Sequence, residues 1–260
     1  MFPLRDHNPT GKIPYATYLL MVMNIAIFAA YWSSLEDTRV IIAFFDAWAF
    51  TPALFSSGEN SIGLVTSMFL HGGIMHLAGN MLFLWIFGDN MEEQFGSVGF
   101  LVFYFACGIA ATLAHWMSVP NSAVPLVGAS GAIAGVMGGY LLLFPKAKVD
   151  ILFIFVIFFR IFSVPAWVML GVWFGLQLLS GIGSSSSGAG VAYWAHAGGF
   201  VIGLILTLPL WFKNGARTYW TANHGHPPHP DAHYNWAKSS VPKIERSKKT
   251  SRIPSFRRRD

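Results

Sequence analysis

Two polar residues at the starts of apolar runs have the types that nucleophilic catalysis requires. Ser130 stands in the segment GASG at the start of one apolar run, and His196 stands in AHAGGF at the start of another. A serine hydroxyl becomes a nucleophile when a neighbouring base takes its proton, and the pKa of histidine suits that role near neutral pH. The pattern therefore predicts a pair with Ser130 as nucleophile and His196 as general base.

A third polar group lies in the segment HGGIMHLAGN, which contains His71, His76 and Asn80. His76 and Asn80 are four residues apart, so on a helix they share a face one turn apart. Attack by a serine creates a tetrahedral oxyanion, which needs donors already in place. Both side chains can donate, as can the backbone N–H of Ser130 if a helix begins there. Asp89 lies a helix length beyond Asn80, so no acid obviously completes a triad and we expect a dyad.

The composition indicates that these residues are positioned by membrane helices. Of 260 residues, 54% are hydrophobic and 11% are charged, and the mean hydropathy is +0.50. A soluble domain has about 25% charged residues, so too little polar surface is available here to coat a globule. We therefore predict an all-α, polytopic membrane protein. Six apolar runs predict its transmembrane helices: Tyr15–Trp32, Met75–Phe87, Phe100–Met117, Gly131–Phe144, Ala166–Leu179 and Trp194–Trp211.

Three of these runs, the second, fourth and fifth, are shorter than the ~17 residues that usually cross a bilayer. Short spans are tolerated where other helices and a water-filled cavity surround them, which suggests a site inside the bundle. Another apolar run, Ile151–Phe159, is also short and is followed by Arg160 and Pro165. We expect it to be an interfacial or re-entrant segment between the fourth and fifth helices. Gln177, in the fifth run, is expected to bond a neighbouring helix.

Lysine and arginine are distributed unevenly, and this predicts the orientation of the chain. Eleven of the 17 lie after Phe212, whereas the loops at 33–67, 118–127 and 181–193 contain only Arg39 between them. Cytoplasmic loops carry the excess of basic residues, so we expect both termini in the cytoplasm. The first run lacks a cleavage site and is expected to be a retained anchor. The expected organisation is a cytoplasmic N-terminus (1–14), a membrane domain (15–212) and a basic, disordered cytoplasmic tail (213–260) that would favour anionic inner-leaflet lipids.

With six helices, the second, fourth and sixth run in the same direction, and each polar group falls at the outer start of one of them. If Ile151–Phe159 crossed the membrane, His196 would lie at the opposite surface from Ser130. Small residues also recur at every fourth position, as Gly131, Gly135 and Gly139 in the fourth run and as Ala195, Gly199 and Gly203 in the sixth. Such stripes let helix backbones approach closely in lipid, which would bring the serine and the histidine together.

The motifs HGGIMHLAGN, GASG and AHAGGFVIG, in this order on alternate helices, resemble those of the rhomboid family of intramembrane serine proteases. The resemblance covers roughly residues 15–211. It implies that Ser130 is the nucleophile, that His196 is the general base, and that His76 and Asn80 form the oxyanion hole with the Ser130 amide. His71 matches a family histidine near the site. Residues beside the nucleophile would support the site: Gly128, Ala129 and Gly131.

The resemblance also implies the partners and the location. It predicts cleavage of transmembrane segments of other membrane proteins, with no metal, cofactor or nucleic acid involved. We expect a multi-pass integral protein of the bacterial inner membrane. Two departures from the family concern Ala134, where some members carry an aromatic residue that packs against the histidine ring, and Ala49 after Trp48, where some members carry arginine.

Two other functions stay open at this point. A catalytically silent relative would bind transmembrane clients without cleaving them. A bis-histidine haem or metal protein of the membrane would use histidines of the bundle, but this explains neither Ser130 nor Asn80. Its candidate ligands are His71, His76, His115 and His196.

Overall fold

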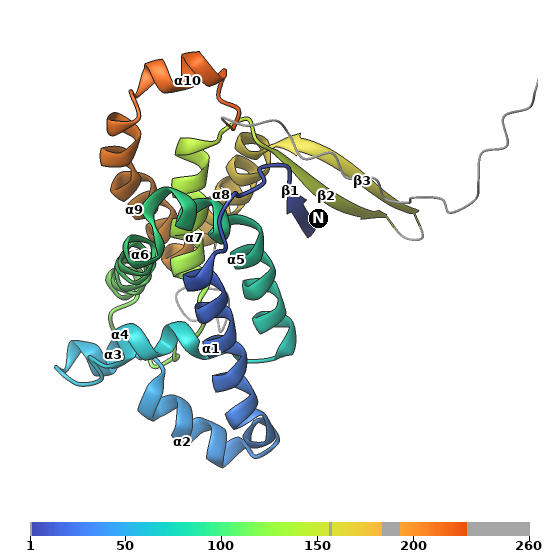
Figure 1. The fold of residues 1–260 in the computed structure, drawn as a ribbon. Helices are drawn as coiled ribbons and strands as arrows, with labels where there is room; N and C mark the ends of the chain where they lie inside the picture. Colours follow the sequence, from blue (N-terminus) through green and yellow to red (C-terminus); the bar gives the residue numbers. More distant parts are fainter. Residues whose placement is uncertain (1, 156–157, 184–192, 228–260) are drawn as a thin grey trace, which may run out of the picture.

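The structure is a computed structural model that describes residues 2–155, 158–183 and 193–227 (Figure 1). Each of its six principal helices overlaps one of the six predicted runs: α1 (Tyr15–Tyr31), α5 (Ile74–Phe95), α6 (Ser97–Ser118), α7 (Ser130–Leu143), α8 (Ala166–Gly183) and α9 (Tyr193–Lys213). Shorter helical segments connect or follow them: η1 (Trp32–Glu36), α2 (Thr38–Trp48), α3 (Pro52–Ser56), α4 (Gly63–Thr66), η2 (Ser67–Phe69) and α10 (Arg217–Asn223). The strands are β1 (Phe2–Asp6), β2 (Lys148–Phe155) and β3 (Phe158–Pro165).

The lengths of these helices agree with a membrane-embedded bundle. Within the described residues, four segments are long and apolar enough to cross a bilayer: α1 with η1, α6, α8 and α9. The segment of α4 and η2 forms with α5 a pair bent by 94° that would count as a fifth span. At 14 residues, α7 extends over about 21 Å, whereas the hydrocarbon core of a bilayer is about 30 Å thick. The short fourth helix was expected from the sequence, but the second and fifth helices are longer than their apolar runs, with 22 residues in α5 and 18 in α8. The number of crossings stays a prediction.

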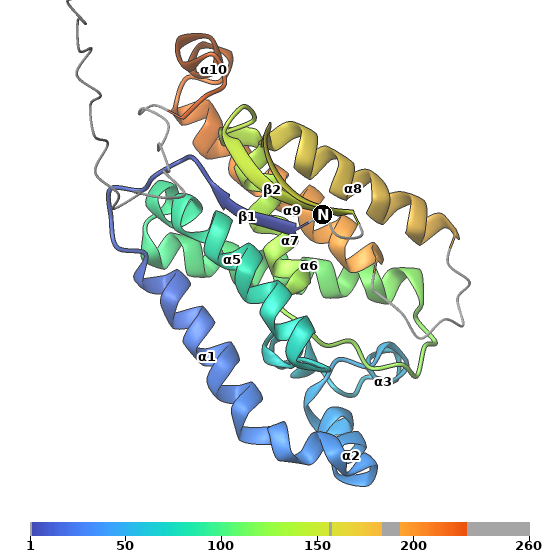
Figure 2. The same ribbon diagram turned by 90° about the vertical axis from the view of Figure 1, so that its right-hand side faces the viewer.

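Contacts at the helix ends establish how the helices run. The Tyr31 hydroxyl at the end of α1 donates to the His71 carbonyl just before α5, and Glu92 near the end of α5 accepts from the N–H groups of Ala16 and Thr17. Thus α1 and α5 are antiparallel. Figures 1 and 2 show α10 and the strands at one end of the bundle and α2 and α3 at the other. The helices α5, α7 and α9 all start at the α3 end, as the predicted topology requires.

The centre of the bundle is α7, whose residues from Gly131 to Tyr140 are all buried. It packs against α9 with almost no side chains between the two backbones. A Cβ atom added at Gly199 would overlap the Gly131 carbonyl, and one added at Gly203 would overlap the Gly135 carbonyl. The small-residue stripes are therefore in contact with one another, as their spacing predicted.

The strands depart from the all-α expectation. The run Ile151–Phe159, predicted as an interfacial or re-entrant segment, contributes most of β2 and the first residues of a β-hairpin's return strand, β3. The strands β2 and β3 are antiparallel with Leu152 opposite Ile161, and β1 pairs antiparallel with the other edge of β2. In Figure 1 the hairpin extends away from the helices. Isoleucine, valine and phenylalanine favour strands, and a continuous apolar run has no period that distinguishes strand from helix.

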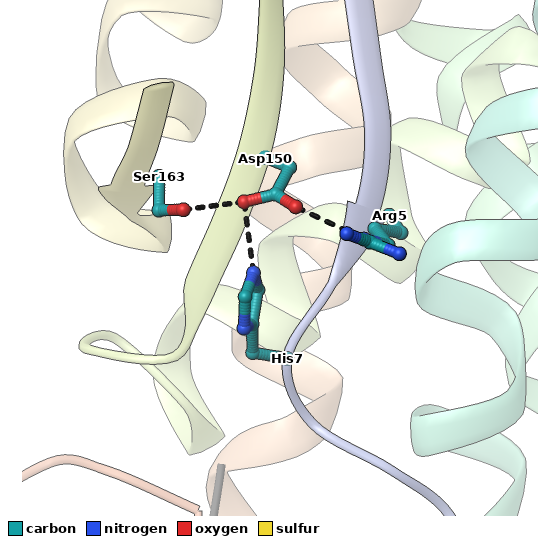
Figure 3. Close-up of polar contacts among 4 residues, drawn as sticks. All are labelled: Arg5, His7, Asp150 and Ser163. Atoms are coloured by element: carbon teal, nitrogen blue, oxygen red, sulfur yellow. Dashed lines mark hydrogen bonds and ion pairs between the residues drawn. The ribbon is translucent and has the colours of Figure 1, made fainter. Parts of the chain in front are cut away.

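A buried carboxylate fastens β1 to this hairpin (Figure 3). Asp150 on β2 accepts hydrogen bonds from Arg5 Nε at 2.9 Å, His7 Nε2 at 2.8 Å and the Ser163 hydroxyl at 2.5 Å. Burial by itself raises the pKa of Asp150, but the hydrogen bonds from Ser163, His7 and Arg5 outweigh it and hold the pKa below its usual value. Charge-assisted bonds of this kind are stronger than neutral ones, so Asp150 holds all three strands together.

The predicted disordered tail differs from the structure at its start. Residues Arg217–Asn223 form α10, and the indole of Trp220 donates to the Leu142 carbonyl at the end of α7 over 3.0 Å. Most of the basic tail (228–260) and most of the loop at 181–193 (184–192) lie outside the described residues.

The contact between α7 and α9 can be tested with Gly199→Ala. The added methyl group would meet the Gly131 carbonyl, and overpacking of a rigid core typically costs about 1–3 kcal/mol. We expect a lower midpoint of unfolding in detergent micelles. The matched control is Gly171→Ala on α8, where an added Cβ has no atom within 4 Å. Equal midpoints for the two variants would contradict the close packing.

A second prediction concerns Asp6 in β1, which accepts a hydrogen bond of 2.7 Å from the Tyr140 hydroxyl. Burial raises the pKa of Asp6 to about 8, and the nearby Asp89 adds to this effect. The folded protein then holds a proton that the unfolded chain releases above about pH 4, so this residue lowers the free energy of unfolding as the pH rises from about 4 to 8. Asp6→Asn cannot ionise and keeps an oxygen acceptor for Tyr140.

We therefore expect Asp6→Asn to be more stable than the native protein at pH 8, with the difference vanishing near pH 4. Thermal unfolding across that pH range measures it. Asp46→Asn, at an exposed position of α2, serves as the control and should leave the pH profile unchanged. If the native protein and Asp6→Asn lose stability in parallel, the carboxyl is already ionised in the folded state.

Candidate active site

Ser130 and His196 lie in hydrogen-bond contact. Ser130 is the first residue of α7 and His196 lies in the first turn of α9. The Nε2 atom of the histidine is 2.7 Å from the serine Oγ. This contact follows from the parallel packing of α7 and α9, because Gly199, one turn beyond the histidine, lies against the carbonyl of Gly131. A larger residue at Gly199 would push α9 away from α7 at the level of the pair.

The second ring nitrogen of His196 also has a partner. Its Nδ1 lies 2.8 Å from Oε1 of Gln177 on α8. The prediction that Gln177 bonds a neighbouring helix is confirmed. Trp173, one turn earlier on α8, has its ring 5.8 Å from the imidazole at an angle of 38°. Ala134 on α7 presents no ring, so in this chain the aromatic neighbour of the histidine comes from α8.

A cavity of about 220 Å³ lies beside the serine and the histidine. Its lining is mostly apolar, with a few polar groups at the serine: Met75, His76, Gly79, Asn80, Phe83, Ser130, Ile133, Met137, Trp173 and His196. The predicted residues of α5 thus reach the same space as those of α7 and α9.

Three hydrogen-bond donors are available at this cavity. Asn80 is buried, and its Nδ2 has no partner within the part of the chain that the structure describes. His76 Nδ1 accepts from the Gly72 N–H at 3.4 Å, so the neutral ring carries its proton on Nε2. The Ser130 N–H belongs to the first turn of α7, before the first intrahelical bond, which joins Ile133 N–H to the Ala129 carbonyl.

Gly128, in the loop before α7, lies close to both His76 and the serine and leaves room for the His76 ring. Its φ is +126°, a value that residues with a side chain rarely adopt. A Cβ atom there would lie 2.7 Å from His76 Nε2 and 3.6 Å from Ser130 Oγ. The Gly128 N–H donates to the Ser67 carbonyl at 2.9 Å, which ties this loop to η2.

His71 has a different environment from His76. It is fully buried, and neither ring nitrogen has a hydrogen-bond partner among the described residues. Its backbone is held on both sides by Tyr31, whose hydroxyl accepts from the His71 N–H at 2.6 Å and donates to its carbonyl. Its ring lies 5.1 Å from that of His76, edge to face. His71 therefore stands behind His76 and is not among the described residues that line the cavity.

The comparison with known proteins agrees with this architecture. Residues 59–213 match the model of the rhomboid domain. This chain belongs to the rhomboid family. It is thus an integral membrane protein of mainly helical fold, and the resemblance predicted from the three motifs is confirmed.

Several family members are similar to parts of the chain. Rhomboid protease GluP of Bacillus subtilis (strain 168) is 38% identical over 133 residues, which cover 50% of this chain and 25% of the relative. Rhomboid protein 1, mitochondrial, of Saccharomyces cerevisiae (strain ATCC 204508 / S288c) is 32% identical over 155 residues, or 56% of this chain and 41% of the relative. Rhomboid-like protein 11, chloroplastic, of Arabidopsis thaliana is 44% identical over 71 residues, 27% of this chain and 25% of the relative. The chain spans less than half the length of these relatives.

Sequence reasoning did not assign Gln177 and Trp173 to the site. A signal was present, because they are four residues apart and share a face of α8. Gln177 is also the only amide in the apolar run Ala166–Leu179. What the pattern lacked was the rotation of α8, which decides that this face meets His196.

Gly128→Ala tests the geometry of the cavity. The strained backbone and the collision with the His76 ring should displace that donor from the serine. Removing one oxyanion donor costs a serine protease about 10²–10³ in kcat, so we expect labelling of Ser130 by a fluorophosphonate to slow about tenfold or more. Gly171→Ala, with open space around the added methyl group, should label at the native rate. Native labelling of Gly128→Ala would show that this loop does not position His76.

Proposed function

We propose that this chain is an intramembrane serine endopeptidase that cleaves transmembrane segments of other membrane proteins. The observation that carries the proposal is the contact of 2.7 Å between Ser130 Oγ and His196 Nε2 at a cavity of the helical bundle. Membership of a family that includes named proteases supports it. A largely apolar cavity within a membrane bundle suits an apolar peptide better than a polar one.

The reaction follows from the arrangement of the proposed groups. Ser130 Oγ attacks the carbonyl carbon of the scissile bond, and its proton passes to His196 Nε2. The negative charge that forms on the carbonyl oxygen is held by donors from Asn80, His76 and the Ser130 N–H. The C–N bond then breaks, and the leaving amine takes the proton from His196. A water molecule, deprotonated by His196, hydrolyses the serine ester and restores the hydroxyl.

The remaining proposals concern topology and location. Six spans with both termini in the cytoplasm would place the serine near the outer surface, since α5, α7 and α9 run in the same direction. The bacterial inner membrane is the proposed location. Fractionation of the producing cell tests this, because relatives in mitochondria and chloroplasts share the family.

The other two functions have less support. A haem or metal protein would explain neither Ser130 nor Asn80, and for a metal ion the described residues contain no group of three or more His, Cys, Asp or Glu that could hold it. A silent binder would not require the hydrogen bond between Ser130 and His196. Labelling by a fluorophosphonate discriminates this case, because only an activated serine reacts with it.

Ser130→Ala and His196→Ala should each abolish cleavage of a reporter transmembrane substrate in proteoliposomes. Loss of the nucleophile or the base in a serine protease costs on the order of 10⁶ in kcat, so cleavage should fall below detection. The control is Ser118→Ala, at an exposed serine at the end of α6. Cleavage that persists in Ser130→Ala would refute the proposal, as would a native protein that neither cleaves nor reacts with the fluorophosphonate.

A further inference from the structure

We infer that Gln177 is a positioning residue for His196, with its amide oxygen accepting the Nδ1 proton so that Nε2 faces Ser130 as a proton acceptor. The expected effect of Gln177 on catalysis rests on the proposed function. The contacts of Gln177 and Ser130 with the His196 ring do not depend on that function. The distance from Nδ1 to Oε1 is 2.8 Å and that from Nε2 to Ser130 Oγ is 2.7 Å, so the ring is held at both nitrogens.

The physical need for such a residue comes from the tautomers of imidazole. A neutral ring carries one proton, and only the form with the proton on Nδ1 offers a lone pair at Nε2. In water the two forms exchange readily, but inside an apolar bundle the partner of Nδ1 decides between them. The Gln177 oxygen can only accept a hydrogen bond, so it selects the form in which the base can take the serine proton.

An amide also suits the surroundings better than the carboxylate of a triad. An ionised carboxylate in an apolar membrane bundle carries a large desolvation penalty unless it is paired. Glutamine accepts the same hydrogen bond with no net charge. It fixes the tautomer and the ring orientation, but it stabilises the imidazolium less than a carboxylate would. Gln177 thus orients the His196 ring without placing a charged group in the apolar bundle.

A second contact from the same helix supports this assignment. Trp173, four residues before Gln177, packs against the His196 ring and lies 6.1 Å from the ring of Phe200 on α9. The ring face and the Nδ1 edge of the histidine are therefore both held by one face of α8.

The support of the base thereby depends on where α8 lies. Among the described residues of α8, only Ala166, Leu170 and Gly181 are buried, which makes it a peripheral helix of the bundle. Ser130 lies on α7, and His76 and Asn80 lie on α5. A shift of α8 relative to α9 would therefore separate Gln177 from His196 without moving the serine.

The test compares Gln177→Leu, which removes the acceptor at similar size, with Gln177→Glu, which keeps it and adds charge. For Gln177→Leu we expect kcat to fall about 10- to 100-fold with little change in KM, less than the ~10⁴ lost in serine proteases when the triad aspartate becomes asparagine and selects the wrong tautomer. Gln177→Glu should retain cleavage. The acidic limb of its pH–rate profile should move to higher pH, because a carboxylate stabilises the imidazolium.

Leu179→Ala, at an exposed position two residues further along α8, is the matched control and should behave as the native protein. Nitrogen-15 NMR of labelled histidine provides a readout that does not require cleavage. The native protein should show His196 protonated at Nδ1, and Gln177→Leu should show a mixture of tautomers. If Gln177→Leu does not fold, the spectrum of the native protein and the pH profile of Gln177→Glu decide the question.

Native rates and an unmixed tautomer in Gln177→Leu would overturn the inference, as would an acidic limb in Gln177→Glu that does not move. These failures are distinct from failure of the proposed function. If the proposed function fails, the native protein will show no cleavage and no fluorophosphonate labelling. The tautomer measured by NMR would still report whether Gln177 binds Nδ1 of His196.

Discussion

The close contact between α7 and α9 is the constraint on which the rest of this structure depends. Lipid offers no hydrophobic drive for helices to associate, so membrane helices pair where small residues let their backbones come close. Here the carbonyls of Gly131 and Gly135 lie directly against Gly199 and Gly203. Such close parallel contact leaves little freedom for one helix to slide along the other. Because the candidate nucleophile and base stand beside these stripes, the packing that builds the core also sets their separation.

Helix α5, which carries His76 and Asn80, is held in place by polar contacts with α1. The N-terminus of α1 is bound by Glu92 of α5, through the N–H groups of Ala16 and Thr17 at 2.9 and 2.8 Å. A carboxylate at a helix N-terminus also interacts favourably with the helix dipole. At the opposite end, Tyr31 brackets the backbone of His71. Two polar clamps thus fasten α5 to α1 and fix where α5 presents its side chains to α7.

The three-stranded sheet lies at the end of the bundle opposite α2 and α3 (Figure 1). The hairpin β2–β3 leads directly into α8, and Asp150 joins it to the first residues of the chain. Asp6 adds a bond from β1 to Tyr140 on α7. The N-terminal segment is therefore part of the folded domain. Since α8 carries the residues that contact His196, the sheet anchors the start of the helix on which the orientation of that ring depends.

The sequence by itself determined the features that are encoded locally. Apolar runs located the six principal helices, the four-residue spacing of small residues indicated the contact surfaces, and three short motifs identified the family. The candidate site residues were recognised because each of them stands near the start of a predicted helix at a similar depth. Ser130, His196, His76 and Asn80 are of this kind, and their roles remain proposals.

Only the tertiary structure decided how distant segments pair and how helices rotate. The strand β1 pairs with residues about 145 positions away, and an apolar run such as ILFIF has no alternation that would reveal a strand. The contact of Gln177 with His196 depends on which face of α8 turns towards α9, and the packing of all neighbouring helices sets that rotation. The same is true of Gly128. Its positive φ is a property of the folded loop before α7, and no pattern of residues in the sequence indicates it.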